Sequence, residues 1–291
     1  MTRKKATGIM ITKTELDKLV KKYETVDFIE NDPIQFCHRF TKKEEIELAG
    51  FIASLFAYGN RKIFIKKLDE IFSKAEGDLL GYIKNSDFTN LKGVEYRFSK
   101  DNDIIPIFEI LSKLYNESRG LEELFEYGYS ISTLIPPTGT LSHQERKECA
   151  SSTLDMGQAF LQTVVDYFYS QAPKTASTGF YHMIPNPQNG GAMKRMNMFL
   201  RWMIRKGPVD LGIWNFIEPK DLLIPLDVHV ARVSRDLGLL KRKSNDFQSV
   251  IELTNKLREL CPSDPIKYDF AMFAFGIELN NIKSKKRGNN V

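Results

Sequence analysis

Apolar residues recur at spacings of three and four along most of this 291-residue chain, and no other feature constrains its fold as strongly. Between residues 45 and 72 the apolar face is interrupted at Tyr58-Gly59-Asn60, a turn signal between two helices. No six-residue run alternates in the way that β-hairpins require. The pattern therefore predicts an all-α fold. Further helices are predicted at 104–115, 154–169, 192–205, 250–260 and 268–279, and loops at 131–142 and 172–191.

Composition excludes several classes of protein. No apolar run is long enough to span a bilayer, and the N-terminal apolar stretch is too short for a secretory signal. Cys37, Cys149 and Cys261 are widely dispersed, which fits reduced thiols and provides no metal-binding cluster. We therefore expect a cytoplasmic protein without a membrane partner, metal or cofactor. The net charge of +5 is compatible with a nucleic-acid partner, although the basic tail at 283–287 is typical of a solvated terminus.

A glycine turn, Gly190-Gly191, opens directly into a helix. Glycine adopts positive φ at little cost, and the helix start would present backbone N–H groups and a positive dipole end to a phosphate. Lys194, Arg201 and Arg205 fall on one line of this helix, opposite its apolar face. We expect these three residues to form an exposed basic stripe. An ordinary amphipathic surface helix would show the same pattern.

A second helix start lies at Asp227. The apolar run that precedes it ends at Pro225, and Val230, Val233 and Leu237 form the apolar stripe of the helix that follows. Asp is a preferred N-cap residue, so capping alone would explain its position.

The run Pro-Leu-Asp-Val-His-Val-Ala-Arg-Val at 225–233, followed by Leu237-Gly238, resembles the proline–aspartate signature of the helix-hairpin-helix (HhH-GPD) DNA glycosylases. The resemblance covers roughly residues 46–80 and 180–280, and the segment 85–150 has no counterpart. Asn189-Gly190-Gly191-Ala192 replaces the usual Leu-Pro-Gly-Val-Gly of the hairpin, with the lysine just after it. The spacing of 33 residues from Lys194 to Asp227 is longer than in most members of this superfamily and is closer to that of archaeal 8-oxoguanine glycosylases. The sequence is closer still to an uncharacterised bacterial family related to these enzymes.

The resemblance implies an all-α, two-lobed HhH-GPD-like fold with the active site in the cleft between the lobes. One lobe would be residues 46–205, with the hairpin at 186–194, and the other would be residues 1–45 plus 206–291. It also implies a monomeric base-excision repair glycosylase acting on duplex DNA that carries a damaged base such as 8-oxoguanine, and found on the nucleoid when bound to DNA. In that chemistry Asp227 stabilises positive charge on the sugar, and Lys194 attacks C1′ and permits strand cleavage.

Further candidate residues come from the helix geometry at 190–205 and from the same resemblance. The DNA-contacting set is Gly190, Gly191, Arg195, Arg201, Arg205 and His229. The candidate base pocket is Tyr58, Asn60, Met198, Phe270 and Phe273, although aromatic and methionine residues at helical spacing are more often core. Two alternatives stay open: a non-catalytic nucleic-acid-binding protein that keeps the fold, and an interaction scaffold without a nucleic-acid role.

Overall fold

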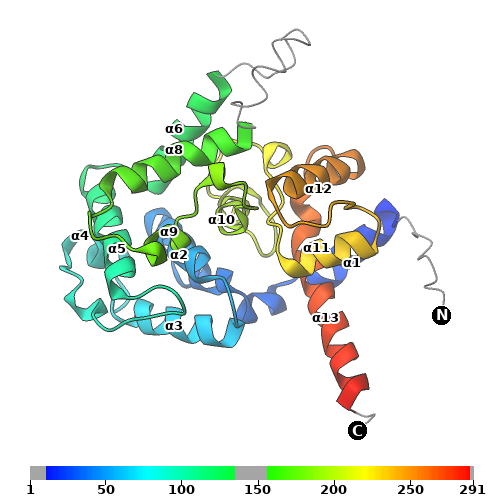
Figure 1. Ribbon diagram of the computed structural model, residues 1–291, viewed down its shortest axis with the longest axis horizontal. Coiled ribbons are helices and arrows are strands. Elements are labelled where there is room, and N and C mark those ends of the chain that lie inside the picture. Colours follow the sequence, from blue (N-terminus) through cyan, green and yellow to red (C-terminus); the bar gives the residue numbers. More distant parts are fainter. Residues whose placement is uncertain (1–10, 135–155, 289–291) are drawn as a thin grey trace. The chain divides into compact units, whose positions relative to one another are not determined.

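The computed structural model describes residues 11–134 and 156–288 and is helical over most of them (Figure 1). No β-strand occurs in those two ranges, so the prediction of an all-α fold is confirmed. Extended pairing within them is limited to isolated bridges such as Tyr96–Ser99 and Lys206–Leu211. None of the described helices combines the length and the apolar character needed to cross a membrane.

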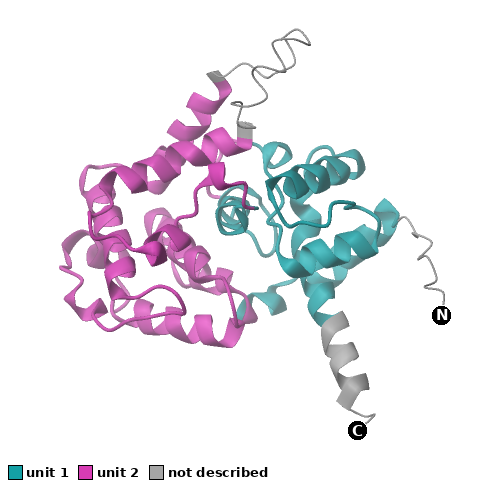
Figure 2. Ribbon diagram, viewed as in Figure 1, with its two compact units in different colours: residues 1–30, 192–212, 218–291 teal, residues 31–191, 213–217 magenta. Residues whose placement is uncertain are grey.

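The chain forms two compact units (Figure 2). Unit 1 consists of residues 1–30, 192–212 and 218–291, and unit 2 consists of residues 31–191 and 213–217. Helix α10 (Lys194–Ile204) therefore belongs to unit 1, whereas the sequence-based division places it in the central lobe.

Unit 2 is built around helix α2 (Lys43–Phe56), which is buried from Glu45 to its last residue. The predicted break after it is confirmed, because Asn60 caps α3 (Arg61–Ser73) by accepting a hydrogen bond from the Ile63 N–H. The remaining elements of this unit are η2 (Pro33–Arg39), α4 (Leu79–Asn85), η3 (Thr89–Leu91), α5 (Asp101–Asn116), α6 (Leu121–Leu134), α8 (Met156–Gln171), α9 (Thr178–Met183) and η5 (Pro187–Asn189).

Two predicted loops differ from the structure. The loop predicted at 172–191 contains the short helix α9, which begins where the Ser177 hydroxyl accepts a hydrogen bond from the Gly179 N–H. A helix of this length is too short to produce a periodic apolar pattern, so the sequence gives no signal for it. Of the loop predicted at 131–142, residues 131–134 end helix α6 and the others lie outside the described residues.

Unit 1 packs two helices against its last one. Helices α1 (Lys13–Tyr23) and α11 (Val228–Asp236) both contact α13 (Asp269–Gly288). Tyr23 and Ala271 belong to the buried cluster between α1 and α13. The other elements are η1 (Val26–Asn31), which begins in this unit, α10, η6 (Pro219–Asp221), α12 (Phe247–Leu260) and η7 (Pro265–Tyr268). The side chains of the basic tail lie outside the described residues.

Candidate functional site

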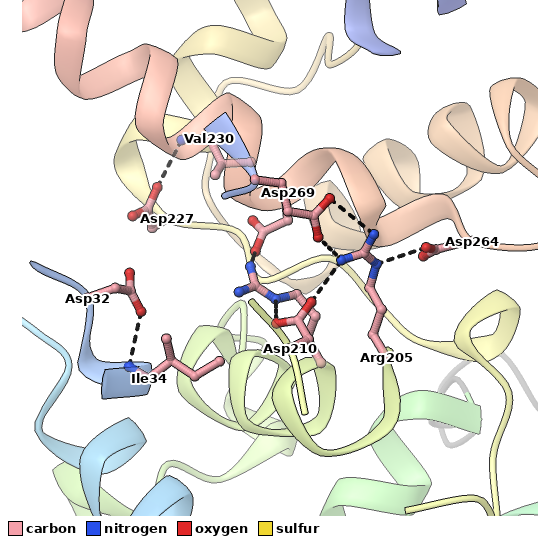
Figure 3. Close-up of polar contacts among 10 residues, drawn as sticks. Asp32, Ile34, Arg205, Asp210, Asp227, Val230, Asp264 and Asp269 are labelled. Carbon is pink, nitrogen blue, oxygen red and sulfur yellow. Dashed lines mark hydrogen bonds and ion pairs between the residues drawn. The ribbon is translucent and has the colours of Figure 1, made fainter. Parts of the chain in front are cut away.

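Asp227 is the N-cap of α11, as its position in the sequence predicts. Its backbone is extended, and its Oδ1 atom accepts a hydrogen bond of 2.8 Å from the Val230 N–H (Figure 3). The same atom accepts a second hydrogen bond of 2.8 Å from the His229 N–H. Both cap bonds end on the same carboxylate oxygen, so the cap does not use Oδ2. The side chain is half-buried. Asp227 is therefore held in one orientation at the positive end of a helix, with one oxygen outside the cap.

Lys194 is the first residue of α10. The residue before it, Met193, has a left-handed backbone (φ 49°, ψ 30°) and makes no side-chain cap hydrogen bond. Gly190 also has a positive φ of 71° and ends η5, so the predicted turn is present. Gly191 does not have a left-handed φ, and a Cβ there would meet nothing within 4 Å. The second unusual backbone position before the helix is therefore Met193, which the glycine pattern did not indicate.

Arg201 is buried, with only 3% of its surface exposed. Its Nε donates to Asp210 Oδ1 at 3.1 Å, and a second guanidinium nitrogen donates to Asp269 Oδ2. Buried guanidinium groups require such partners because desolvation of an unpaired charge is very costly. Arg201 is therefore enclosed by carboxylates within unit 1.

Arg205, one turn further along α10, is 7% exposed. Its Nε donates to Asp264 Oδ2 at 2.8 Å, and its other nitrogens donate to Glu24 and to Asp210 Oδ2 (Figure 3). Burial alone would lower the pKa of Arg205, but the hydrogen bond to Glu24 and the charges of Asp210, Asp264 and Glu24 raise it above its usual value. The prediction that Arg201 and Arg205 form an exposed DNA-binding stripe is wrong, because four carboxyl groups enclose both guanidinium groups inside unit 1.

Asp269, the first residue of α13, connects this buried network to both predicted catalytic residues. It is 4% exposed. Burial raises the pKa of its carboxyl group to about 7, and the charge of Asp227 adds to that rise. The charges of Arg201 and Lys194 act in the opposite direction. Lys194 and Asp227 are thus both close enough to Asp269 for their charges to act on it.

The excess of acid around the two arginines agrees with the raised pKa of Asp269. Two guanidinium groups face four carboxyl groups, those of Glu24, Asp210, Asp264 and Asp269. If all four were ionised, the cluster would carry two negative charges in excess. A proton on Asp269 halves that excess, which favours its neutral form near neutral pH.

The other residues predicted for the site are distributed over both units. His229 lies against Phe273, with ring centroids 5.7 Å apart and the rings nearly perpendicular, where α11 packs on α13. Phe270 is buried with the Arg201 guanidinium 5.6 Å from its ring centre, and Met198 is buried in α10. Arg195 is half-buried as the second residue of α10. The base-pocket candidates in unit 2 are Tyr58 and Asn60.

Sequence reasoning missed Asp269, whose pKa is shifted by the charges of both predicted catalytic residues. It follows Tyr268 in a short polar stretch with no motif, and its partners are distant in sequence, so no local signal marks it. Within residues 11–134 and 156–288, no group of three His, Cys, Asp or Glu side chains is arranged so that it could hold a metal ion.

Comparison with protein families gives a match over most of the chain. The family model described as "Protein of unknown function (DUF2400)" matches residues 32–278, well over half of the chain. The chain belongs to the DUF2400 family. The DUF2400 match includes Lys194, Asp227, Asp269, Arg201 and Arg205, whereas the ion-pair partner Glu24 lies before it. No curated protein and no solved structure matches the chain significantly.

Proposed function

We propose that this DUF2400 protein is a DNA base-excision glycosylase in which Lys194 and Asp227 carry the reaction. The observation that carries the proposal is their common relationship to Asp269: one lysine and one aspartate, each at the start of a helix, act on the same buried carboxyl group. The resemblance of 225–233 to the proline–aspartate signature supports it. An HhH-GPD-like architecture, action as a monomer and a cytoplasmic location are parts of the same proposal.

The chemistry needs a carboxylate and an amine. When the bond between C1′ and the base nitrogen breaks, the base leaves with the bonding electrons and positive charge develops on the sugar. The Asp227 carboxylate stabilises that charge. The Lys194 amine forms a bond to C1′, and opening of the sugar ring then gives a Schiff base, from which elimination of the 3′ phosphate cleaves the strand. The departing base, which carries the bonding electrons, takes up the proton that the amine releases.

Burial of Arg201 and Arg205 changes which residues would contact DNA. Neither guanidinium is available to a phosphate, so the contacts proposed at α10 come from Lys194 and Arg195 in its first turn. The turn at Gly190, which precedes the helix in the chain, supplies a further proposed contact. Duplex DNA with an oxidised guanine is the substrate to test first. The same burial reduces the basic surface of this helix, which favours the non-catalytic binder as the second candidate.

Covalent trapping tests the proposal. Incubation with a duplex containing 8-oxoguanine in the presence of borohydride should leave a covalent protein–DNA adduct on the wild type. Lys194→Gln should abolish the adduct, because an amide cannot form the imine. Lys206→Gln is the matched control, since Lys206 is an exposed lysine just beyond the end of α10. An adduct of equal yield in Lys194→Gln would exclude Lys194 as the nucleophile.

A further inference from the structure

A two-residue turn at Arg97 and Phe98 exposes an aromatic ring on unit 2. Tyr96 and Ser99 exchange backbone hydrogen bonds of 2.8 and 3.0 Å and are both buried. Between them, 62% of Phe98 is exposed. Arg97 has a left-handed φ of 55°. In short turns of this kind, positions with positive φ are usually occupied by Gly, Asn or Asp. The turn thus holds an arginine in an unfavourable backbone conformation beside an exposed phenylalanine.

Several contacts fix the base of this turn. The Tyr96 hydroxyl donates to the Tyr58 carbonyl, and the Tyr58 hydroxyl donates to the Tyr96 carbonyl at 3.2 Å. The Ser99 hydroxyl donates to the Gly179 carbonyl at 3.3 Å. Gly59 permits the close approach, because a Cβ at that position would lie 2.8 Å from the Tyr96 hydroxyl oxygen. The strained conformation is therefore maintained by its surroundings, as is common at functional positions.

Aromatic and cationic groups gather around Phe98. The His182 ring lies 5.3 Å from the Phe98 ring and 4.9 Å from the Tyr58 ring, nearly perpendicular to both. The Arg97 guanidinium lies 5.2 Å from the Phe98 ring centre and 5.9 Å from that of Tyr58. We call Tyr58, Arg97, Phe98 and His182 the aromatic turn cluster.

We propose that the aromatic turn cluster binds an unpaired nucleobase, with Phe98 stacking on the base and Arg97 contacting the neighbouring phosphate. An exposed aromatic ring beside a guanidinium matches the two parts of a nucleotide, a flat π face and an anion. Among residues 92–100, three exposed cations (Lys92, Arg97 and Lys100) outnumber one exposed anion (Glu95), and the nearby Asp101 carboxylate accepts hydrogen bonds from the N–H groups of Gly93 and Asn102.

This inference rests on the proposed function, because that function makes DNA the partner. The turn at Arg97 and Phe98 is a second DNA-binding site, separate from Lys194 and Asp227. Arg97 and Phe98 lie within 85–150, the segment that has no counterpart in the glycosylases that the chain resembles. Stacking at Phe98 would hold a base that has left its pair, or the bases of a single strand. It requires no catalysis at Lys194 and can therefore be measured separately.

The test compares two single-stranded probes of equal length and charge, one of thymidine and one of abasic residues, by fluorescence anisotropy at fixed salt. Phe98→Ala should weaken thymidine binding roughly 5- to 150-fold, the range for loss of one aromatic–base stack. Binding of the abasic probe should not change. Phe98→Trp should retain the affinity, and Phe98→Leu should resemble Phe98→Ala. Tyr127→Ala is the matched control, because Tyr127 is 58% exposed on α6 and should not matter.

Each other outcome has a defined meaning. If Phe98→Ala binds the thymidine probe as tightly as the wild type, there is no stacking site at Phe98. If Phe98→Ala binds weakly but Phe98→Leu binds as tightly as the wild type, the contact is apolar and is not stacking. If the wild type binds neither probe and no duplex, both this inference and the proposed function fail. If Phe98 matters but no base is ever released from DNA, the stacking site stands and the glycosylase proposal fails.

Discussion

Arg201 on α10 donates a hydrogen bond to Asp269 at the start of α13, and both residues are almost completely buried. The pair connects α10, which begins with Lys194, to α13, against which the Asp227-capped helix α11 packs. Asp269 therefore belongs to a structural network, and the charges of the proposed catalytic residues Lys194 and Asp227 act on its pKa. Substitutions in the network should affect stability and chemistry in ways that can be separated.

Arg201→Met should destabilise the protein by on the order of 3–5 kcal/mol, because it leaves Asp269 without its buried counter-charge and leaves Asp210 with Arg205 alone. Arg242→Met is the control: the pair of Arg242 with Asp246 is partly exposed, so its loss should cost about 0–1 kcal/mol. Urea denaturation measures both. A fully stable Arg201→Met protein whose DNA affinity depends less steeply on salt would instead place Arg201 on the surface.

Asp269→Asn should change how stability depends on pH. Burial raises the pKa of Asp269 to about 7, whereas an unfolded Asp titrates at about 3.9. Between these values the folded state binds the extra proton, so this group's contribution to stability is present at low pH and is lost as pH rises towards and through 7. The stability of Asp269→Asn relative to the wild type should therefore increase from pH 4.5 to pH 7, by up to a few kcal/mol.

Denaturation at the two pH values provides the measurement for Asp269. Asp246→Asn is the control: its hydrogen bond from Arg242 lowers the pKa of Asp246, so its titration lies below this range. The relative stability of Asp246→Asn should stay nearly constant. An equally constant difference for Asp269→Asn would mean that Asp269 is already ionised at pH 4.5 in the folded protein.

Two substitutions at Asp227 separate capping from catalysis. Asparagine is as good an N-cap as aspartate, so Asp227→Asn should leave the free energy of unfolding nearly unchanged. Asp227→Ala loses the hydrogen bonds from the N–H groups of His229 and Val230 and should cost about 1 kcal/mol. Thermal or urea unfolding distinguishes them, and equal stability of all three proteins would show that the cap contributes nothing.

Alanine substitutions at the two adjacent glycines of the turn should differ in their effect on stability. Gly190→Ala should cost about 1–2 kcal/mol because its φ of 71° is unfavourable for a residue with a Cβ. Gly191→Ala should change stability by less than about 0.5 kcal/mol, because its Cβ would enter open space. If Gly191→Ala nevertheless weakens duplex binding, DNA approaches the backbone at Gly191. If both variants are equally unstable, the turn differs from the one described.

The sequence was sufficient for features that depend on local pattern. Apolar periodicity located α2, α3, α5, α12 and the break at Tyr58–Asn60, and residue type identified Asp227 as an N-cap. The short helix α9 was missed because a helix of 6 residues is too short to show a periodic pattern of apolar residues.

The buried network could not be predicted because its contacts are long-range. A charged residue opposite an apolar face is normally exposed, and Arg205 is buried only because Glu24, 181 residues away, and Asp264, 59 residues away, supply carboxylates. The positive φ of Met193 and Arg97 is equally invisible, since neither is a residue type that favours it.

The most direct test of the central claim is release of the damaged base by wild type and by Asp227→Asn from duplexes carrying oxidised, alkylated or uracil bases. We predict that the wild type releases at least one of these bases, and that Asp227→Asn binds the same duplex with similar affinity but releases the base on the order of a hundredfold or more slowly. Release without a trapped adduct would leave Asp227 as the catalytic residue and remove that role from Lys194. Binding of all three duplexes by the wild type with no base released from any of them would contradict the glycosylase proposal and identify a non-catalytic DNA-binding protein.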